Sequence, residues 1–328
     1  MLSVLITVDT ESYAKGKPDA QIWGLAGDGQ EYGIRRIMDT LERHGARGTF
    51  YVNVYESGRH GEDAMRKVIR TIHERGHDVE LHTHPRDLYG IDKLSRVDVA
   101  RQREILAWGK AFIEQETAQP LVAHRAGAFA ANLQTLTALR DLGITVDSSL
   151  SAAWWECHLA KEAASPNRPF VLNGVLELPA TVYTQARLGS RRFIRMLDIQ
   201  ASSLLELKSV VRQAATQKVS AINVLMHSHS FVRDGRGDTR VLKRLDRLLA
   251  FLAREPDAQA VTTRAFVARH QSDNTAATDL APFEPYTGWW LTYLRLVESI
   301  GLGWKTTVAA LAPPLALVTA GLVAYALL

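Results

Sequence analysis

The stretch that decides the fold is Asp78-Val79-Glu80-Leu81-His82-Thr83-His84-Pro85, in which a strand-like run ends in two histidines. Successive side chains of a β-strand point to opposite faces, so the imidazoles of His82 and His84 project from the same face. Pro85 cannot donate a ladder hydrogen bond and keeps the preceding residue extended, which predicts a strand that runs into a loop. The pair therefore stands at the carboxyl end of a strand, where parallel α/β folds collect catalytic groups.

Outward from this stretch, strand-like apolar runs alternate with amphipathic helical patterns from residue 2 to about residue 270. Strands are predicted at residues 2–9, 48–54, 78–84, 121–125, 144–149, 220–227 and 259–263. Helices are predicted at residues 32–44, 62–75, 97–116, 132–142, 202–217 and 239–254. This order predicts an α/β fold, a distorted (β/α) barrel of about seven strands that forms a catalytic domain over residues 1–270. An insertion at residues 151–195 interrupts the alternation, and its Asn173-Gly174 pair predicts a hairpin turn.

Composition excludes some classes of protein. With 39 Lys and Arg against 35 Asp and Glu, the 328 residues carry a formal charge of +4, and basic residues are interspersed with acidic ones along the predicted helices. This pattern is typical of solvated helix faces and not of a nucleic-acid surface, so no nucleic-acid partner is expected. The single cysteine, Cys157, excludes an internal disulfide and fits a reducing compartment.

The carboxy-terminal part predicts membrane association. Residues 308–328 contain no charged residue, and these 21 residues would span about 31 Å as a helix. We expect a transmembrane helix at residues 306–328, an interfacial amphipathic helix at 287–305 that carries several aromatic residues, and a polar linker at 271–286. Arg295 and Lys305 on the domain side, together with an amino terminus that does not read as a signal peptide, predict a domain on the cytosolic face. The alternative for the apolar run is a buried helix of the soluble core.

Potentially reactive side chains fall at the ends of four predicted strands. Asp9 and Glu11 follow the first strand and share a face, as do His82 and His84 after the third. The fourth strand ends in Arg125, and the sixth ends in His227. Two histidines and a carboxylate form a three-point site that leaves a position open on a metal such as zinc. A second carboxylate can then accept a proton from water, an adjacent arginine can keep it ionised, and a further histidine can protonate a departing amine. The pattern predicts hydrolysis of an amide or ester.

These segments resemble the polysaccharide deacetylase family, also called the NodB homology family. The resemblance rests on Thr7-Val8-Asp9-Thr10-Glu11, His82-Thr83-His84-Pro85, Arg125-Ala126-Gly127 and Leu225-Met226-His227, and it covers about residues 2 to 270. It implies a distorted barrel and a single divalent metal ion, Zn²⁺ or another transition metal. It also implies an enzyme that removes acetyl groups from glycans. Carried over, it makes Asp9 the base, Arg125 the partner of that base, His227 the acid, and His82 and His84 metal ligands.

Two departures from the family pattern affect the metal site. The usual adjacent aspartates are replaced by Asp9-Thr10, so the third ligand is Glu11 or Asp9 itself, and we assign Glu11. The usual histidine pair is spaced by four residues, whereas His82 and His84 are spaced by two. A metal geometry that differs from the usual one is therefore expected.

Three further residues are candidates for substrate binding. His229 shares a face with His227, and its alternative is an ordinary loop role. Trp154 and Trp155 in the insertion can stack on sugar rings, and the alternative for both is to plug the barrel mouth.

The leading hypothesis is a membrane-tethered, metal-dependent hydrolase that removes an acyl group, N-acetyl above all, from a glycan or lipid-linked amino sugar at the cytosolic membrane face. The expected partners are this substrate and membrane lipid. One alternative is an amidohydrolase of the same fold that acts on a non-sugar amide. The other is a catalytically silent, membrane-tethered glycan-binding protein.

Overall fold

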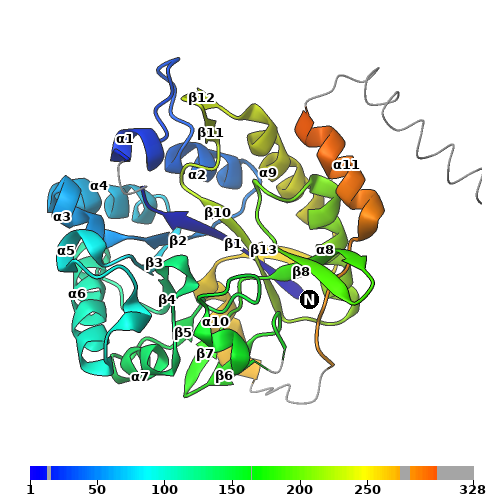
Figure 1. Ribbon diagram of the computed structural model, residues 1–328. Helices are drawn as coiled ribbons and strands as arrows, with labels where there is room; N and C mark the ends of the chain where they lie inside the picture. The colour runs from blue at the N-terminus through cyan, green and yellow to red at the C-terminus, as the bar shows by residue number, and fades with distance from the viewer. Residues whose placement is uncertain (13–15, 164, 274–280, 301–328) are drawn as a thin grey trace, which may run out of the picture.

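The computed structural model describes residues 1–12, 16–163, 165–273 and 281–300. Its main sheet has nine strands in the order β10-β1-β2-β3-β4-β5-β7-β6, with β13 paired to β1 (Figure 1). All pairings in this sheet are parallel except that of β6 with β7. The strands are β1 (Leu2–Thr10), β2 (Thr49–Val52), β3 (Asp78–Thr83), β4 (Ala123–Ala126), β5 (Val146–Asp147), β6 (Phe170–Leu172), β7 (Val175–Glu177), β10 (Ala221–His227) and β13 (Ala258–Val261).

All seven predicted strands are present, but the count of about seven is too low for the sheet as a whole. The predicted hairpin forms, with Asn173 and Gly174 both at positive φ between β6 and β7. It is not a separate insertion, because β7 joins β5 in parallel register through Val146 and Leu176. Val175 and Glu177 are buried, so the hairpin supplies the eighth parallel strand. A two-residue turn signal identifies a hairpin but carries no information on the sheet that the hairpin joins.

The six predicted helices also form, and they cover the outside of the sheet (Figure 1). They are α2 (Ile34–Arg43), α4 (Glu62–His73), α6 (Val99–Thr117), α7 (Leu133–Asp141), α8 (Leu204–Thr216) and α9 (Thr239–Leu252). Further helices are α1 (Pro18–Gln21), α3 (Ser57–His60), α5 (Arg86–Tyr89), α10 (Thr263–Asp273) and α11 (Gly288–Ile300), with 3-10 turns η1 (Val54–Glu56), η2 (Leu94–Arg96), η3 (Gly127–Phe129) and η4 (His158–Lys161). Two small antiparallel pairs, β8 (Val182–Leu188) with β9 (Arg191–Met196) and β11 (Val232–Arg233) with β12 (Arg236–Gly237), complete the description.

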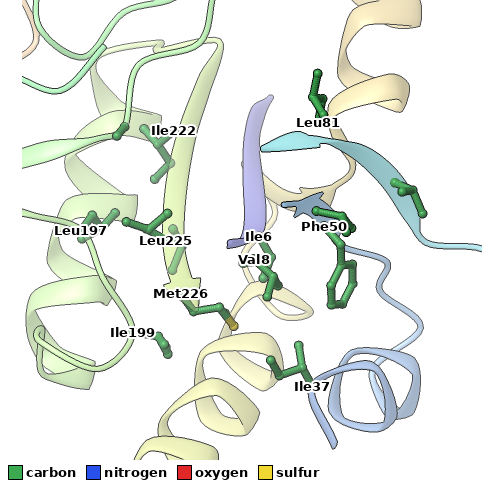
Figure 2. Packing of buried hydrophobic residues seen from close by; sticks show 14 of the residues in the cluster. Ile6, Val8, Ile37, Phe50, Leu81, Leu197, Ile199, Ile222, Leu225 and Met226 are labelled. Atoms are coloured by element: carbon green, nitrogen blue, oxygen red, sulfur yellow. The ribbon is translucent and has the colours of Figure 1, made fainter. Parts of the chain in front are cut away.

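Strand β1 is buried along its whole length, and its two faces have different roles. Val4, Ile6 and Val8 pack outward against the helix layer, where Figure 2 shows Ile6 and Val8 close to Ile37 of α2. Leu5 belongs instead to a second apolar cluster, with side chains of β2, β4, β5, β13 and α10. Because side chains alternate along a strand, Thr7 and Asp9 follow Leu5 on the inner face. The inside of the barrel thus changes from apolar to polar toward the carboxyl end of β1.

The barrel is closed between β7 and β10 by irregular chain. Asn223 of β10 donates its amide hydrogens to the carbonyl oxygens of Leu178 and Pro179, at 3.0 and 2.8 Å. Leu225 exchanges backbone hydrogen bonds of 2.9 Å with the segment that contains Leu197 and Ile199. This closure brings His227, at the end of β10, to the same rim as the ends of β1, β3 and β4.

The segments that follow the barrel pack against it. Phe283, inside the predicted linker 271–286, is fully buried, and the backbone nitrogen of Thr184 donates to the carbonyl oxygen of Pro285. The predicted interfacial segment 287–305 contains α11, which lies against β8. Within the described residues, no helix combines the length and the apolar composition that crossing a bilayer requires. The predicted transmembrane segment 306–328 lies outside the described residues.

Candidate active site

The structure brings Glu11, His82 and His84 together at the rim of the barrel. One ligand atom from each lies within 4.8 Å of the others, which is the arrangement expected of three ligands to one metal ion. Nε2 of His84 is 3.0 Å and Nε2 of His82 is 3.5 Å from the same oxygen, Oε2 of Glu11. Nδ1 of His82 donates to the carbonyl oxygen of Arg125 at 2.9 Å, which fixes the ring and leaves Nε2 directed at the cluster.

Two structural details account for the departures from the family pattern. Thr10 is fully buried, and its hydroxyl donates to the carbonyl oxygen of Val8, so Glu11 carries the carboxylate that reaches the histidines. Gly127 permits the position of His84, because an added Cβ there would lie 2.3 Å from Cε1 of the imidazole. The histidines spaced by two residues therefore converge from one strand end with their ring centroids 4.9 Å apart.

Arg125 and Asp9 form a buried ion pair directly below this cluster. Nη1 of Arg125 lies 2.6 Å from Oδ1 of Asp9, and the arginine side chain is wholly inaccessible to solvent. Its remaining hydrogens are donated to the hydroxyls of Thr7 and Ser148 and to the carbonyl oxygen of Ser148. The guanidinium also lies 4.2 Å from the ring centre of Tyr51. The buried guanidinium therefore has a carboxylate partner, hydrogen-bond acceptors and an aromatic ring around it, which offset the cost of removing its charge from water.

The charges of the site keep both carboxylates ionised. Burial alone would raise the pKa of Asp9, but Arg125, His82 and His227 outweigh it and lower that pKa below its ordinary value. Burial likewise opposes ionisation of Glu11, yet His84 and His82 hold its pKa well below the usual range. Two anionic oxygen groups and two imidazoles within one rim form a donor set that suits a divalent transition metal.

His227 stands at the same rim, where its half-buried ring has Nε2 3.8 Å from Oε1 of Glu11. The ring of His229 lies beside it, with centroids 5.1 Å apart and planes inclined by 36°. Burial, followed by the neighbouring His227, lowers the pKa of His229 to about 4. His229 is therefore neutral near pH 7 and adjoins the predicted acid.

A cleft of about 430 Å³ opens next to the cluster and includes Glu11 and His84 in its lining. Several of its other lining residues were not among the sequence candidates, namely Ser12, Asn53, Glu56, Arg59, Arg86, Asp87, Asp92, Lys93, Ala128 and Glu156. Its wall carries both cationic and anionic side chains, including Lys93 paired with Glu156 and Arg59 paired with Asp87. A wall of this kind presents hydrogen-bond donors and acceptors to a polar ligand.

One hydrogen-bonded unit in this cleft connects two of the clustered residues. The carboxylate of Glu56 accepts hydrogen bonds from the backbone nitrogen and the hydroxyl of Ser12, at 2.7 and 2.6 Å, directly after Glu11. Asn53 donates to the same carboxylate at 3.2 Å, and its oxygen accepts from the backbone nitrogen of His84 at 3.2 Å. Asn53 ends the segment after β2, so its place at a parallel strand end was the signal that could have identified it.

The predicted tryptophans lie near the cleft but in different environments. Trp155 is 86% exposed, with the Lys93 ammonium 5.5 Å from its ring centre. Trp154 is 38% exposed and lies 6.4 Å from the ring of Phe129. Neither side chain is buried, so neither plugs the barrel. Cys157 is buried, and its thiol donates to the carbonyl oxygen of Ser149.

Comparison with known proteins agrees with this geometry. The sequence profile of the polysaccharide deacetylase family matches residues 16–146, a stretch that contains His82, His84 and Arg125. The resemblance seen in the motifs is therefore confirmed over this stretch, which is similar to polysaccharide deacetylases, a family of hydrolases that act on amide bonds. Asp9, Glu11 and His227 lie outside the matched stretch.

Solved structures share the fold. A putative polysaccharide deacetylase from Mycobacterium smegmatis aligns with a TM-score of 0.58 and 19% identity, over 86% of this chain and 94% of that one. The Puue allantoinase aligns with a TM-score of 0.54 and 12% identity, over 84% of this chain and 92% of that one. A search of curated proteins finds no match. At these identities the structural likeness defines the fold alone.

Proposed function

We propose that this protein is a metal-dependent deacylase that removes an acyl group, N-acetyl above all, from a glycan or an amino sugar. The observation that carries the proposal is the meeting of Glu11, His82 and His84 within 4.8 Å, beside the buried pair of Asp9 and Arg125. A divalent ion such as Zn²⁺ held by these three residues would supply Lewis acidity toward the substrate carbonyl.

The protein's own residues supply the proton transfers. Asp9, kept ionised by Arg125, accepts a proton from the attacking water, and the water oxygen forms a bond to the acyl carbon. His227 donates a proton to the nitrogen as the carbon–nitrogen bond breaks, so the products are a free amine and a carboxylic acid. The polar cleft holds the sugar, with its hydroxyls matched by the charged wall and an apolar ring face stacked on Trp155. The ring of His229 packs beside His227, the proposed acid, and helps to hold that ring in place.

The substrate is also proposed to be lipid-linked, and the protein to be attached to the cytosolic face of a membrane. The uncharged run of residues 308–328 supports attachment, because a hydrolase tethered at a bilayer has a raised effective concentration toward a bilayer substrate. Deletion after Ile300 is the appropriate test, since the described residues from Phe283 to Arg295 pack on the domain. The deletion is expected to spare turnover of a soluble analogue and to lower turnover of the lipid-linked form. Equal loss on both substrates would contradict the lipid-linked part.

The central experiment is metal quantification together with a substrate panel. Purified protein is expected to contain a stoichiometric divalent metal and to release acetate from acetylated amino sugars, with both lost on chelation and restored by Zn²⁺. His82→Ala is expected to lose metal, whereas His158→Ala, at η4, is the matched control. Turnover of small cyclic amides but not of sugars would favour the non-sugar amidohydrolase. Absence of metal with indifference to His82→Ala would favour the silent glycan-binding protein.

A further inference from the structure

The hairpin of β8 and β9 forms, together with the start of α11, an exposed surface that the proposed chemistry does not use. Fourteen large hydrophobic side chains are exposed in the described part of the chain, and six of them belong to this region. They are Leu188 (66% exposed), Phe193 (45%), Ile194 (37%), Tyr286 (41%), Trp289 (53%) and Trp290 (48%). We call this group, with the arginines of the hairpin, the hairpin surface.

Side chains of the hairpin and of the start of α11 contact one another within the hairpin surface. The rings of Phe193 and Trp289 are 6.2 Å apart, and Nε1 of Trp289 donates to the carbonyl oxygen of Arg187 at 2.9 Å. The guanidinium of Arg187 in turn lies 5.3 Å from the ring centre of Tyr286. Exposed apolar side chains gathered in this way mark an interaction site more often than isolated ones do.

The charge of the hairpin is of one sign. Residues 182–196 contain Arg187, Arg191, Arg192 and Arg195 and no acidic residue, and Arg187 stands directly opposite Arg192 across the two strands. Glu284 pairs with Arg192, which leaves the region strongly basic. Arginines interleaved with aromatic and aliphatic side chains match the headgroup zone of a bilayer, where phosphates meet acyl chains.

The sequence that follows α11 indicates which partner binds the hairpin surface. Arg295 of α11 pairs with Glu206 of α8 at 3.6 Å, so this helix is held on the domain at Arg295, and the uncharged run of residues 308–328 follows it in the sequence. A second copy fits poorly, because a two-fold contact would oppose the arginines to themselves. An acidic glycan would match the arginines but leave the apolar side chains in water.

We propose that the hairpin surface docks on an anionic phospholipid bilayer, with Leu188 and the aromatic side chains in the headgroup zone and the arginines on lipid phosphates. The inference rests on the membrane attachment proposed above, and it adds the face of the domain that meets the lipid and the charge of that lipid. It does not depend on the deacylase activity.

Single-site fluorescence on the full-length chain tests this docking. Cys157 is 4% exposed, so Leu188→Cys introduces one accessible site for an environment-sensitive label. Vesicles of phosphatidylcholine with phosphatidylglycerol, containing brominated lipid, are expected to quench a label at position 188. Val171→Cys, at a 68% exposed position on the β6–β7 hairpin, is the matched control and is expected to stay unquenched. Vesicles of phosphatidylcholine alone are expected to quench position 188 less.

Charge reversal separates the arginine contribution. Arg191→Glu is expected to lower the docked population in anionic vesicles by roughly fivefold or more, given the attraction of one arginine to an anionic surface. The same change at the exposed Arg254 is expected to have no effect. A label at Val318→Cys reports attachment itself, so quenching at 318 without quenching at 188 overturns the docking surface and leaves attachment intact. Equal quenching at position 188 in both vesicle types would contradict the proposed preference for anionic lipid. Burial of position 188 without lipid, in a dimer, overturns the proposal in favour of a second copy.

Discussion

The guanidinium of Arg125 lies 2.6 Å from the carboxylate of Asp9 inside the barrel, and no part of the arginine side chain is accessible to solvent. Two residues 116 positions apart in the sequence thus form the charged layer between the apolar interior and the cluster of Glu11, His82 and His84. Because each charge is buried, each depends on the other for compensation.

Arg125→Met is therefore expected to destabilise the protein by about 3–5 kcal/mol, since it leaves the Asp9 carboxylate buried without a counter-charge. Chemical denaturation measures this loss. The double variant Asp9→Asn with Arg125→Met is expected to recover part of the stability while remaining inactive. If the stability loss of the double variant equals the sum of the losses of Asp9→Asn and Arg125→Met alone, the two side chains are not energetically coupled.

The close approach of Gly127 to His84 predicts a specific effect on metal binding. Gly127→Ala places a Cβ 2.3 Å from the His84 ring, which must move away from Glu11. We expect a loss of zinc affinity of roughly 10–100-fold, the range seen when the support of a ligand is removed. Titration with a competing chelator measures it. Gly27→Ala, where the nearest atom to the added Cβ is 3.6 Å away, is the control, and an equal loss there would refute a local effect.

Asn53 and Glu56 are predicted to position the proposed metal ligands Glu11 and His84 without binding the metal themselves. Asn53→Ala removes both the link to the backbone of His84 and the link to Glu56, and Glu56→Ala releases Ser12 next to Glu11. Both variants are expected to weaken metal affinity by roughly tenfold or more. Glu56→Gln keeps an acceptor oxygen and is expected to lose less than Glu56→Ala. Glu62→Ala, on the exposed side of α4, serves as the control, and unchanged metal affinity in Asn53→Ala would exclude the positioning role.

His77 predicts a loss of stability in acid. Its Nδ1 accepts a hydrogen bond from the backbone nitrogen of Gly48, so Nε2 carries the proton and donates to Glu42. Burial lowers the pKa of His77 to about 4, below the ordinary value of 6.5, so the folded state holds it neutral. The contribution of neutral His77 to the free energy of unfolding is fully present above pH 6.5. It is lost as the pH falls toward 4, and the total loss is on the order of 3 kcal/mol.

Denaturation at a series of pH values measures this contribution. His77→Asn is expected to flatten the dependence between pH 6.5 and 4, whereas His73→Asn at the end of α4 is expected to leave it unchanged. An unaltered slope in His77→Asn would assign the acid sensitivity to other groups.

Much of the fold could be predicted from the sequence. The two-residue period placed Asp9 with Glu11, and His82 with His84, on shared faces, and the alternation of apolar runs located the seven strands and six helices that form. These features are local, because they depend on spacing along one element. The strand β7 and the β8–β9 hairpin were not predicted as parts of their sheets, because pairing partners depend on contacts distant in sequence.

The sequence by itself determined the alternating α/β order, the strand-end positions of Asp9, Glu11, His82, His84, Arg125 and His227, and the uncharged run of residues 308–328. Tertiary structure alone decided that Glu11, and not Asp9, meets both histidines, that Arg125 lies within hydrogen-bond distance of Asp9, and that Asn53 and Glu56 connect the segments of Glu11 and His84. The reason is physical: periodicity fixes the face of a strand on which a side chain lies, whereas distances between side chains of different strands follow from barrel closure and from packing of the interior.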